Sequence, residues 1–152
     1  MPILEYHLIA GAHRDNDIAE LLLASSKLYA DELACPIDRV RVLVTTHAPQ
    51  HVAVGGYLLS EGGHNAPHFH FLVLQGRSEA QCQALIAGFT DLLARILKVD
   101  KQLIRGGCWP IAPEHWGIGG KPASAMRAAE IKSRAAMVAT GAVAASVGLR
   151  SA

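Results

Sequence analysis

Apolar and polar segments follow the same order twice along the chain. In the first block, Ile3 to Ile9 has the pattern of a strand, and Gly11 ends it. Asp15-Asn16-Asp17 then offers short polar side chains that can accept from the unpaired N–H groups of a first helical turn. Cys35-Pro36 ends that helix, and the β-branched run from Val40 to Thr45 predicts one buried strand. The predicted helix has one apolar face, made of Ile18, Leu21, Leu22, Leu28 and Tyr29.

The second block repeats this order. Phe69 to Leu74 is predicted as a strand, and Gly76 turns the chain. Ser78-Glu79-Ala80-Gln81 is a capping box, in which the Ser hydroxyl and the Gln side chain each satisfy a backbone group at the start of a helix. Asp100 to Cys108 is predicted as the returning strand. The helix between these strands is apolar at steps of three and four residues, at Cys82, Leu85, Ile86, Phe89, Leu92, Leu93 and Ile96.

The ends of the two blocks also match. Pro2 precedes Arg41 by 39 residues, and Pro67 precedes Arg105 by 38. Each block closes on a His-x-x-x-Gly-Gly tail, at residues 51–56 and 115–120. We therefore predict one domain over residues 1–152, with internal repeats at 2–63 and 67–124. Residues 125–152 are Ala-rich, have no counterpart in the first block and are predicted as a C-terminal helical arm.

Each block predicts a β-α-β unit, whose right-handed crossover makes its two strands parallel. Two such units predict an α+β fold with a four-stranded mixed sheet and two helices on one face. The other face of the sheet still needs a cover. A second copy of the chain is the simplest one, and we expect a homo-oligomer with trimer-like closure.

Composition narrows the class of function. With 51% hydrophobic and 18% charged residues the chain is globular, and a formal net charge of +1 gives no reason to expect nucleic acid as a partner. The three cysteines share no C-x-x-C spacing, which favours a reducing compartment over a disulfide scaffold. Neither a signal-peptide pattern nor a membrane span is present in the sequence, so we expect a cytoplasmic protein without a membrane partner.

Pro2 is the first candidate for chemistry. Proline at the second position permits removal of Met1, which would leave a secondary amine, whereas Pro67 is locked in an amide. A reference α-amino group has a pKa of about 8, and burial or neighbouring guanidinium groups would lower it toward neutrality. Such an amine can act as general base and then as general acid. The alternative is a proline that merely starts a strand.

Arg77 is the candidate for substrate binding. It follows Gly76 directly before the capped helix, where its guanidinium could hold a carboxylate beside unpaired backbone N–H groups. The first block has Ala12 at the equivalent position. The sequence therefore predicts one complete site per chain, with Pro2 from one block and Arg77 from the other. The alternative is an arginine solvated in a turn.

His64, His68 and His70 come closest to a metal-binding pattern, since His68 and His70 share one face of a strand. No carboxylate or cysteine completes that set, so we expect no metal site. The sequence also has no Ser-His-Asp pattern, no P-loop and no dinucleotide-binding fingerprint.

Taken together, these motifs resemble the tautomerase superfamily. The family member 4-oxalocrotonate tautomerase has a second strand and a C-terminal turn that are similar to residues 40–45 and to the tail at 51–56. Its first turn, with the substrate-binding arginine, is similar to residues 74–79. The tail at 115–120 is similar to the same C-terminal turn, with Trp116 where the family has a phenylalanine. The double length resembles the fused, trimeric members, 5-carboxymethyl-2-hydroxymuconate isomerase and cis-3-chloroacrylic acid dehalogenase.

The resemblance implies a tautomerase or isomerase of aromatic catabolism, without cofactor, acting on a small unsaturated 2-hydroxy or 2-oxo carboxylate as a homotrimer. It implies that Pro2 moves the proton and that Arg77 holds a carboxylate. Arg105, ranked ahead of Arg41, would reach Pro2 from a neighbouring subunit and stabilise the developing enolate. Trp116 would form an apolar wall beside the amine. The alternatives are an interfacial salt bridge for either strand arginine and a plain core or interface aromatic for Trp116.

Two departures from the family narrow the chemistry. The dehalogenase-like members use two arginines that flank the turn glycine, and here the first of these substrate-binding positions is Leu74. They also place a water-activating glutamate just before the tail aromatic, where this chain has His115, with Glu114 one residue away. A dehalogenase, hydratase or decarboxylase acting on a three-carbon acid is therefore the alternative enzyme, and a catalytically silent binding scaffold is the alternative without activity.

Overall fold

The computed structural model describes residues 2–148, with side chains through residue 140. The chain divides into two compact units. The first unit comprises Met1–Val73 with Arg77–Pro110, and the second comprises Leu74–Gly76 with Ile111–Ala152. Met1 and the last four residues of the predicted C-terminal arm lie outside the described residues.

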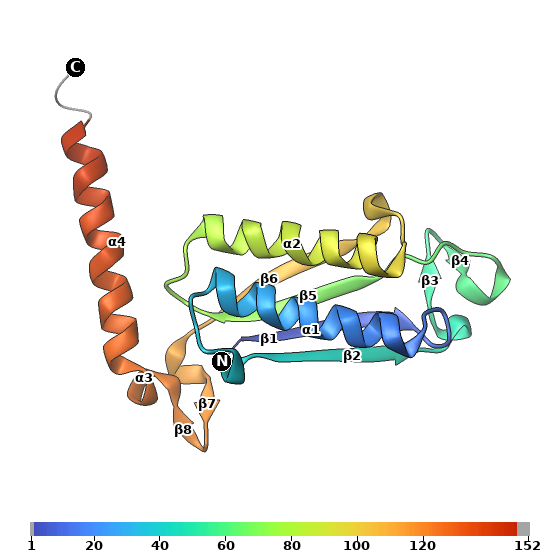
Figure 1. Ribbon diagram of the computed structural model, residues 1–152, viewed down its shortest axis with the longest axis horizontal. Coiled ribbons are helices and arrows are strands. Elements are labelled where there is room, and N and C mark those ends of the chain that lie inside the picture. Colours follow the sequence, from blue (N-terminus) through green and yellow to red (C-terminus); the bar gives the residue numbers. More distant parts are fainter. Residues whose placement is uncertain (1, 149–152) are drawn as a thin grey trace. The chain divides into compact units, whose positions relative to one another are not determined.

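A four-stranded sheet with two helices on one face makes up the first unit (Figure 1). The strand order is β2-β1-β5-β6, and β1 pairs parallel with β2 but antiparallel with β5. Helices α1 and α2 lie side by side over the same face. The α+β fold and the mixed sheet are confirmed. The bounds are β1 (Ile3–Ile9), β2 (Arg41–His47), β5 (His68–Leu74), β6 (Arg105–Ile111), α1 (Asp15–Glu32) and α2 (Glu79–Leu97).

The hydrophobic core lies between this sheet and the two helices. Burial alternates along β1 and β5, so that every second side chain is buried while its neighbours face away from the helices. Phe89 of α2 packs edge-on against four core rings, at centroid distances from 5.2 to 6.5 Å. The core also contains a hydrogen bond of 2.7 Å between the hydroxyls of Tyr6 and Ser25. The large buried side chains of the core are Leu4, Tyr6, Leu8, Leu21, Tyr29, Phe69, Phe71, Leu85, Phe89 and Leu93.

The two halves share the same local geometry where their second strands begin. The Arg41 N–H donates to the carbonyl of Pro2 at 3.0 Å, and the Arg105 N–H donates to that of Pro67 at 3.3 Å. Each arginine side chain also folds back onto the one-turn 3-10 helix before its own strand. Nη1 of Arg41 donates to two carbonyls there at 2.8 and 3.1 Å, and Nη1 of Arg105 does so at 2.7 and 2.9 Å. These turns are η1 (Ile37–Arg39) and η4 (Lys101–Leu103).

The start of the last strand and the N-cap of α1 differ from the prediction, and one predicted cap is confirmed. Residues 100–104 do not belong to the last strand, because the Asp100 carboxylate accepts from the backbone of Gln102 at 2.9 Å and starts η4. At α1 the N-cap is Arg14, which makes no side-chain capping bond, and Asp17 instead accepts two hydrogen bonds from the Arg14 guanidinium. The capping box between Ser78 and Gln81 forms at the start of α2 as predicted.

Each His-x-x-x-Gly-Gly tail forms a two-strand hairpin that turns on paired glycines with positive φ, from 56° to 86°. The first unit contains the pair β3 (Ala53–Val54) and β4 (Tyr57–Leu58), flanked by η2 (Pro49–His51) and η3 (Leu59–Glu61). The second unit contains η5 (Pro113–His115), β7 (Gly117–Ile118), β8 (Lys121–Pro122), α3 (Ala123–Met126) and α4 (Ala128–Gly148). The predicted C-terminal helix is thus present. Among the described residues, none of the helices combines the length and apolarity needed to cross a membrane.

Gly106 in β6 leaves room for the ring of Phe69. A methyl group built at Gly106 would overlap the ring of Phe69, whereas one at Gly107 meets no atom nearer than 3.6 Å. We expect Gly106→Ala to lower the free energy of unfolding by about 1 to 3 kcal/mol, as overpacking does. Gly107→Ala is the matched control and should change it by less than about 0.5 kcal/mol. Urea denaturation measures both, and equal stability of the two variants would contradict the contact.

Candidate functional site

Pro2 is buried at one end of the sheet, directly before β1. The end of β5 lies at the same place, because β5 runs antiparallel to β1 and Ile3 is opposite Leu72. The parallel strand β2 also begins there, with Arg41 opposite Ile3. Pro2 and Arg41 therefore share this end of the sheet, which we call the Pro2 end.

The turn after β5 brings Arg77 to the Pro2 end, where its half-buried side chain reaches the last turn of α1. Nη1 of Arg77 donates to the carbonyl of Leu33 at 2.8 Å, and Nε2 of Gln81 donates to that of Glu32 at 3.0 Å. The Tyr29 hydroxyl donates to a carbonyl oxygen of β5 at 2.6 Å and so ties α1 to the sheet. The C-terminus of a helix exposes carbonyls and carries partial negative charge, which attracts a guanidinium. The sequence predicted Arg77 beside the first N–H groups of α2, and its contact with α1 is new information.

Arg105 lies at the opposite end of the sheet, beside Pro67. Pro67 directly precedes β5, and β5 has seven residues. A strand of that length spans about 23 Å at about 3.3 Å per residue. Within one chain, Arg105 is therefore separated from Pro2 by roughly the length of a strand, and Arg41 is the strand arginine on the Pro2 side.

Leu74 and Trp116 belong to the second unit. Leu74 is the half-buried last residue of β5. Trp116 is half-buried, and its carbonyl accepts from the backbone of Ala123 at 2.8 Å. The indole Nε1 is buried and finds no hydrogen-bond partner among the described residues.

The helix-free face of the sheet carries imidazoles from three neighbouring strands. His7 of β1 is the register partner of His68 of β5, and their rings stack with centroids 4.2 Å apart. Nδ1 of His7 lies 2.9 Å from Nε2 of His47 in β2. His70 stacks on Trp109 of β6 at 4.3 Å. One ring nitrogen from each of His7, His68 and His70 lies within 4.8 Å of the other two, and we call these three residues the histidine cluster.

Burial and mutual repulsion shape the charge of this face. Burial, with the neighbouring His68, lowers the pKa of His7, and burial with His70 lowers the pKa of His68. Glu5 accepts a hydrogen bond of 2.6 Å from the Thr45 hydroxyl, which lowers the pKa of its carboxyl group. At pH 7 the face therefore combines neutral His7 and His68 rings with a carboxylate.

The sequence prediction of no metal site considered His64, His68 and His70 but missed His7. His64 is exposed and lies outside the cluster. The usable signal was the alternation in β1, which places His7 on the face away from the core. Only the pairing of β1 with β5 brings that residue opposite His68.

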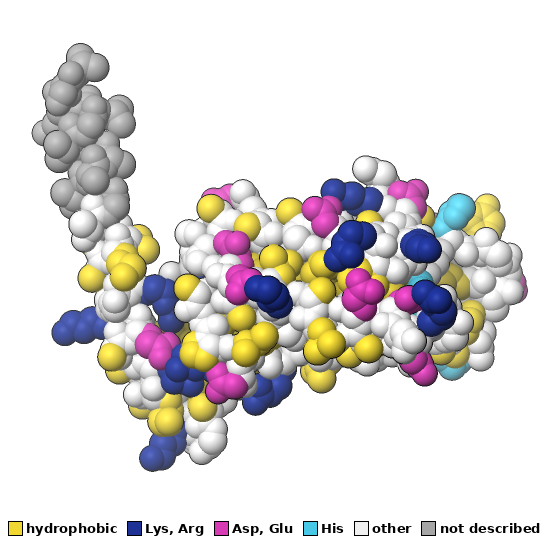
Figure 2. Space-filling model, viewed as in Figure 1, with side chains coloured by type: hydrophobic (Ala, Val, Ile, Leu, Met, Phe, Trp, Pro, Cys, Tyr) yellow, Lys and Arg dark blue, Asp and Glu magenta, His cyan; other side chains and the backbone are white. Residues whose placement is uncertain are grey.

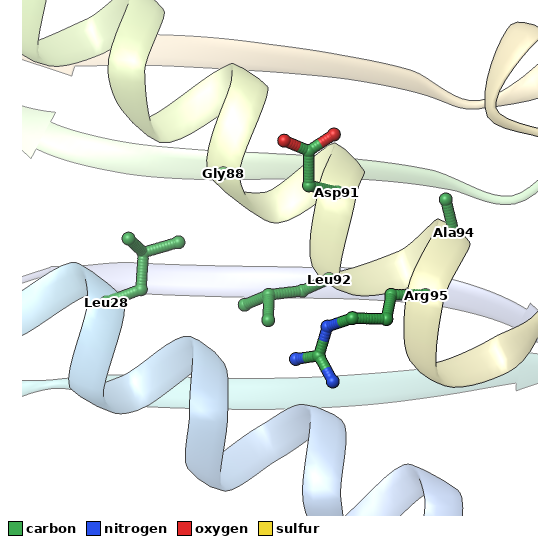
Figure 3. A pocket seen from close by; sticks show the side chains of 6 residues that line it. All are labelled: Leu28, Gly88, Asp91, Leu92, Ala94 and Arg95. Carbon is green, nitrogen blue, oxygen red and sulfur yellow. The ribbon is translucent and has the colours of Figure 1, made fainter.

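Cavities line the sheet and helices of the first unit. One of about 410 Å³ is lined by the histidine cluster with Arg105 and Trp109, and another of about 200 Å³ includes His47 and Pro67. A further cavity, of about 560 Å³, lies between α1 and α2, where Leu28 and Leu92 point into it from the two helices (Figure 3). Figure 2 shows the same side of the molecule, with apolar side chains between charges of both signs. This last groove contains none of the predicted site residues.

Comparisons with known proteins agree with this architecture. A family model described as "Tautomerase enzyme" matches residues 67–126. The structure of a native fused 4-OT is 33% identical and superimposes with a TM-score of 0.76, covering 81% of this chain and 97% of that one. The R7 fused 4-OT, an asymmetric trimer, is 31% identical with a TM-score of 0.74, and the match covers 82% of this chain and 98% of that one. Pt0534, solved after inactivation by 2-oxo-3-pentynoate, is 24% identical with a TM-score of 0.71, covering 82% and 98%. No curated protein matches the chain.

The contacts of Arg77 and Gln81 with the end of α1 predict a measurable loss of stability. Arg77→Met keeps the length of the side chain but removes its donors, and we expect it to lower the free energy of unfolding by about 1 to 2 kcal/mol. Gln81→Met should lower the free energy of unfolding by about 1 kcal/mol. Gln83→Met is the control, because the Gln83 amide donates to Glu79, an exposed neighbour on the same helix. Urea denaturation compares the three, and a loss for Arg77→Met no larger than that of the control would contradict the contact with Leu33.

Proposed function

The chain belongs to the tautomerase superfamily, as a fused 4-OT-like member, and from this membership we propose that it is a tautomerase or isomerase that needs no cofactor. Its substrate is a small, unsaturated 2-hydroxy or 2-oxo carboxylate of the kind formed when aromatic compounds are broken down. The observation that carries the proposal is the arrangement at the Pro2 end. There a buried proline from the first half and an anchored arginine from the second half lie at one end of the same sheet.

Pro2 is the proposed acid and base. Removal of Met1 turns its nitrogen into a secondary amine with a lone pair. The amine takes the proton from the 2-hydroxyl of the substrate, and the electron pair moves through the conjugated chain as a dienolate. The amine then returns the proton to a carbon atom, so the product is the 2-oxo isomer and no other reactant is consumed.

Arg77 is proposed to hold the substrate carboxylate. Its guanidinium carries five N–H donors, and its bond to Leu33 fixes where the group lies. A guanidinium is always charged in proteins, so it binds the carboxylate at any pH at which Pro2 can work. Leu74 and Trp116 are proposed to contribute apolar contacts. The indole N–H of Trp116 has no acceptor in the described part of the chain and is a donor that a bound ligand would satisfy.

A homotrimer is the proposed assembly. The R7 relative is a trimer, and the helix-free face of the sheet is the surface that other copies would cover. Since Arg105 is separated from Pro2 of its own chain, we propose that it reaches Pro2 of a neighbouring copy and stabilises the dienolate there.

The cytoplasm is the proposed location of the activity. Cys82 and Cys108 are free thiols with sulfurs 3.3 Å apart, and a reducing compartment would keep them reduced.

Hydration or hydrolytic dehalogenation is the second candidate, and the structure offers little to support it. Such reactions need a group that activates water beside the proline. Glu114 and His115, the residues nearest to the expected position in the sequence, are both exposed in η5. Incubation with 3-haloacrylates and analysis of the products separates this activity from isomerisation.

Substitution of Pro2 tests the proposed mechanism. We expect Pro2→Ala to lower kcat/KM for the ketonisation of 2-hydroxymuconate by about 100-fold or more, the usual contribution of a general acid and base. Pro67→Ala is the matched control, because its nitrogen is an amide, and it should retain activity. Absorbance in the ultraviolet follows the reaction. Full activity in both Pro2→Ala and a form with a retained N-terminal extension would refute the role of the amine.

Two further measurements separate an enzyme from a silent scaffold. NMR titration of the Pro2 nitrogen should give a pKa below the reference of about 8 for an α-amino group. The amine should also add to the triple bond of 2-oxo-3-pentynoate, so that the peptide containing Pro2 gains the whole mass of the reagent. A reference-like pKa together with an unlabelled peptide would favour the scaffold.

Mixed trimers test whether Arg105 acts across copies. Pro2→Ala and Arg105→Ala chains, each of low activity alone, should regain activity when they are co-assembled, because some sites then combine an intact proline with an intact arginine. A mixture of Pro2→Ala with chains carrying Arg41→Ala provides the comparison. Recovery only in the Arg41 mixture would show that the ranking of the two arginines is wrong.

A further inference from the structure

The helix-free face of the sheet holds four of the eight histidines of the chain, His7, His47, His68 and His70. We propose that the histidine cluster, His7, His68 and His70, forms a binding site for a divalent transition-metal ion, Zn²⁺ in particular. The site lies in the first unit at the Pro67 side of the sheet, away from Pro2. It includes neither Pro2 nor Arg77, but Arg105, which lines the same cavity, is the residue proposed above to reach Pro2 of a neighbouring copy, so the site adjoins the proposed catalytic centre of that copy.

The backbone places the three imidazoles within reach of a common point. His7 and His68 face each other across the antiparallel pair, and His70 follows two residues later on the same face. Directly opposite residues have Cβ atoms about 5 Å apart, and diagonal neighbours lie about 7 to 8 Å apart, which imidazole side chains can bridge. Ring nitrogens within 4.8 Å of one another need to approach by roughly an ångström or more, since Zn–N bonds of about 2.0 to 2.1 Å place tetrahedral ligands about 3.4 Å apart. Side-chain rotation alone can supply such a movement.

Two neighbouring groups orient these rings. His47 lies against Nδ1 of His7, at 2.9 Å. Nε2 of His70 is 3.6 Å from a carboxylate oxygen of Glu5, which is itself held by Thr45. Each of these contacts engages one nitrogen of a ring that has two. Metal-binding histidines commonly use the second nitrogen in this way, with a carboxylate or another polar group that fixes the ring.

The type of ligand indicates the type of metal. Three imidazoles suit Zn²⁺, Cu²⁺, Ni²⁺ and Co²⁺, whereas Mg²⁺ and Ca²⁺ prefer oxygen ligands. The cavity of about 410 Å³ that the three histidines line with Arg105 leaves space for a fourth ligand. A water molecule or a small anion would complete a tetrahedral shell there, and the Arg105 guanidinium favours an anion.

Metal binding requires a visible rearrangement. The rings of His7 and His68 are almost parallel, with an interplanar angle of 4°. A metal lies in the plane of each imidazole that binds it, so two rings stacked face to face do not share a metal without turning. We therefore expect the stack to open on binding, with chemical-shift changes for the cluster and none for the exposed His115.

Zinc titration of the assembled protein tests the site. The protein is prepared without a histidine tag, freed of metal with a chelator and isolated by size exclusion, and a chromophoric indicator competes for Zn²⁺. We expect one Zn²⁺ per chain. His7→Ala and His68→Ala should each weaken binding by more than about 100-fold, and His47→Ala by about 10-fold, in line with the effect of an orienting partner. His115→Ala is the matched control and should bind as the unmodified protein does.

A second measurement does not depend on whether the variants fold. Co²⁺ added to the unmodified protein should give the intense visible absorption of a tetrahedral site, and one equivalent of Zn²⁺ should abolish it. Circular dichroism identifies any histidine variant that is unfolded. His70→Asn then takes the place of that variant in the zinc titration. Absence of saturable binding, or equal affinity in His68→Ala and His115→Ala, would overturn the proposal and leave the cluster as a stacked polar surface between copies of the chain.

Discussion

The antiparallel pairing of β1 with β5 is the constraint on which the rest of the structure depends. It joins the two β-α-β halves into one sheet, with Ile3 opposite Leu72 and His7 opposite His68. Inside each half, the helix crossover makes the two strands parallel, but no crossover of this kind sets the direction in which β1 and β5 pair. Because the joint is antiparallel, the two halves point in opposite directions, and the start of one lies beside the end of the other. For this reason Pro2 and Arg77 lie at the same end of the sheet, and Arg105 lies at the far end with Pro67.

Much of the fold was readable from local signals. Strand β1 was predicted with its observed bounds, and the capping box at Ser78 formed where the side-chain pattern required it. The errors have local causes too. Asp100 was assigned to a strand, although its carboxylate caps a turn, and Asp17 was assigned to a cap, although the Arg14 guanidinium outcompetes the backbone for it. A short acidic side chain near a helix start has several partners of similar strength, and a pattern of residue types does not choose between them.

The candidate site was less predictable than the fold, because it depends on contacts between distant residues. Arg77 was identified from its turn, but its bond to Leu33 spans 44 positions and has no local signature. The alternation in β1 indicates which face His7 lies on, but nothing local indicates that His7 lies opposite His68. Conversely, the complementary pair of Pro2 and Arg77 could be proposed from sequence, because an internal repeat shows which half has lost which residue.

The separation of the two sheet ends has a consequence for how such a chain can diversify. A duplicated enzyme begins with two equivalent reactive ends, and the fusion removes the free amine from one of them at once. Within one chain, a strand's length then lies between Pro67 and Pro2, so substitutions around Pro67 leave the surroundings of that chain's own Pro2 unchanged. The histidines at positions 7, 47 and 68 sit around the Pro67 end. The fusion thus leaves a preformed cavity at the Pro67 end of the sheet, away from Pro2 of the same chain.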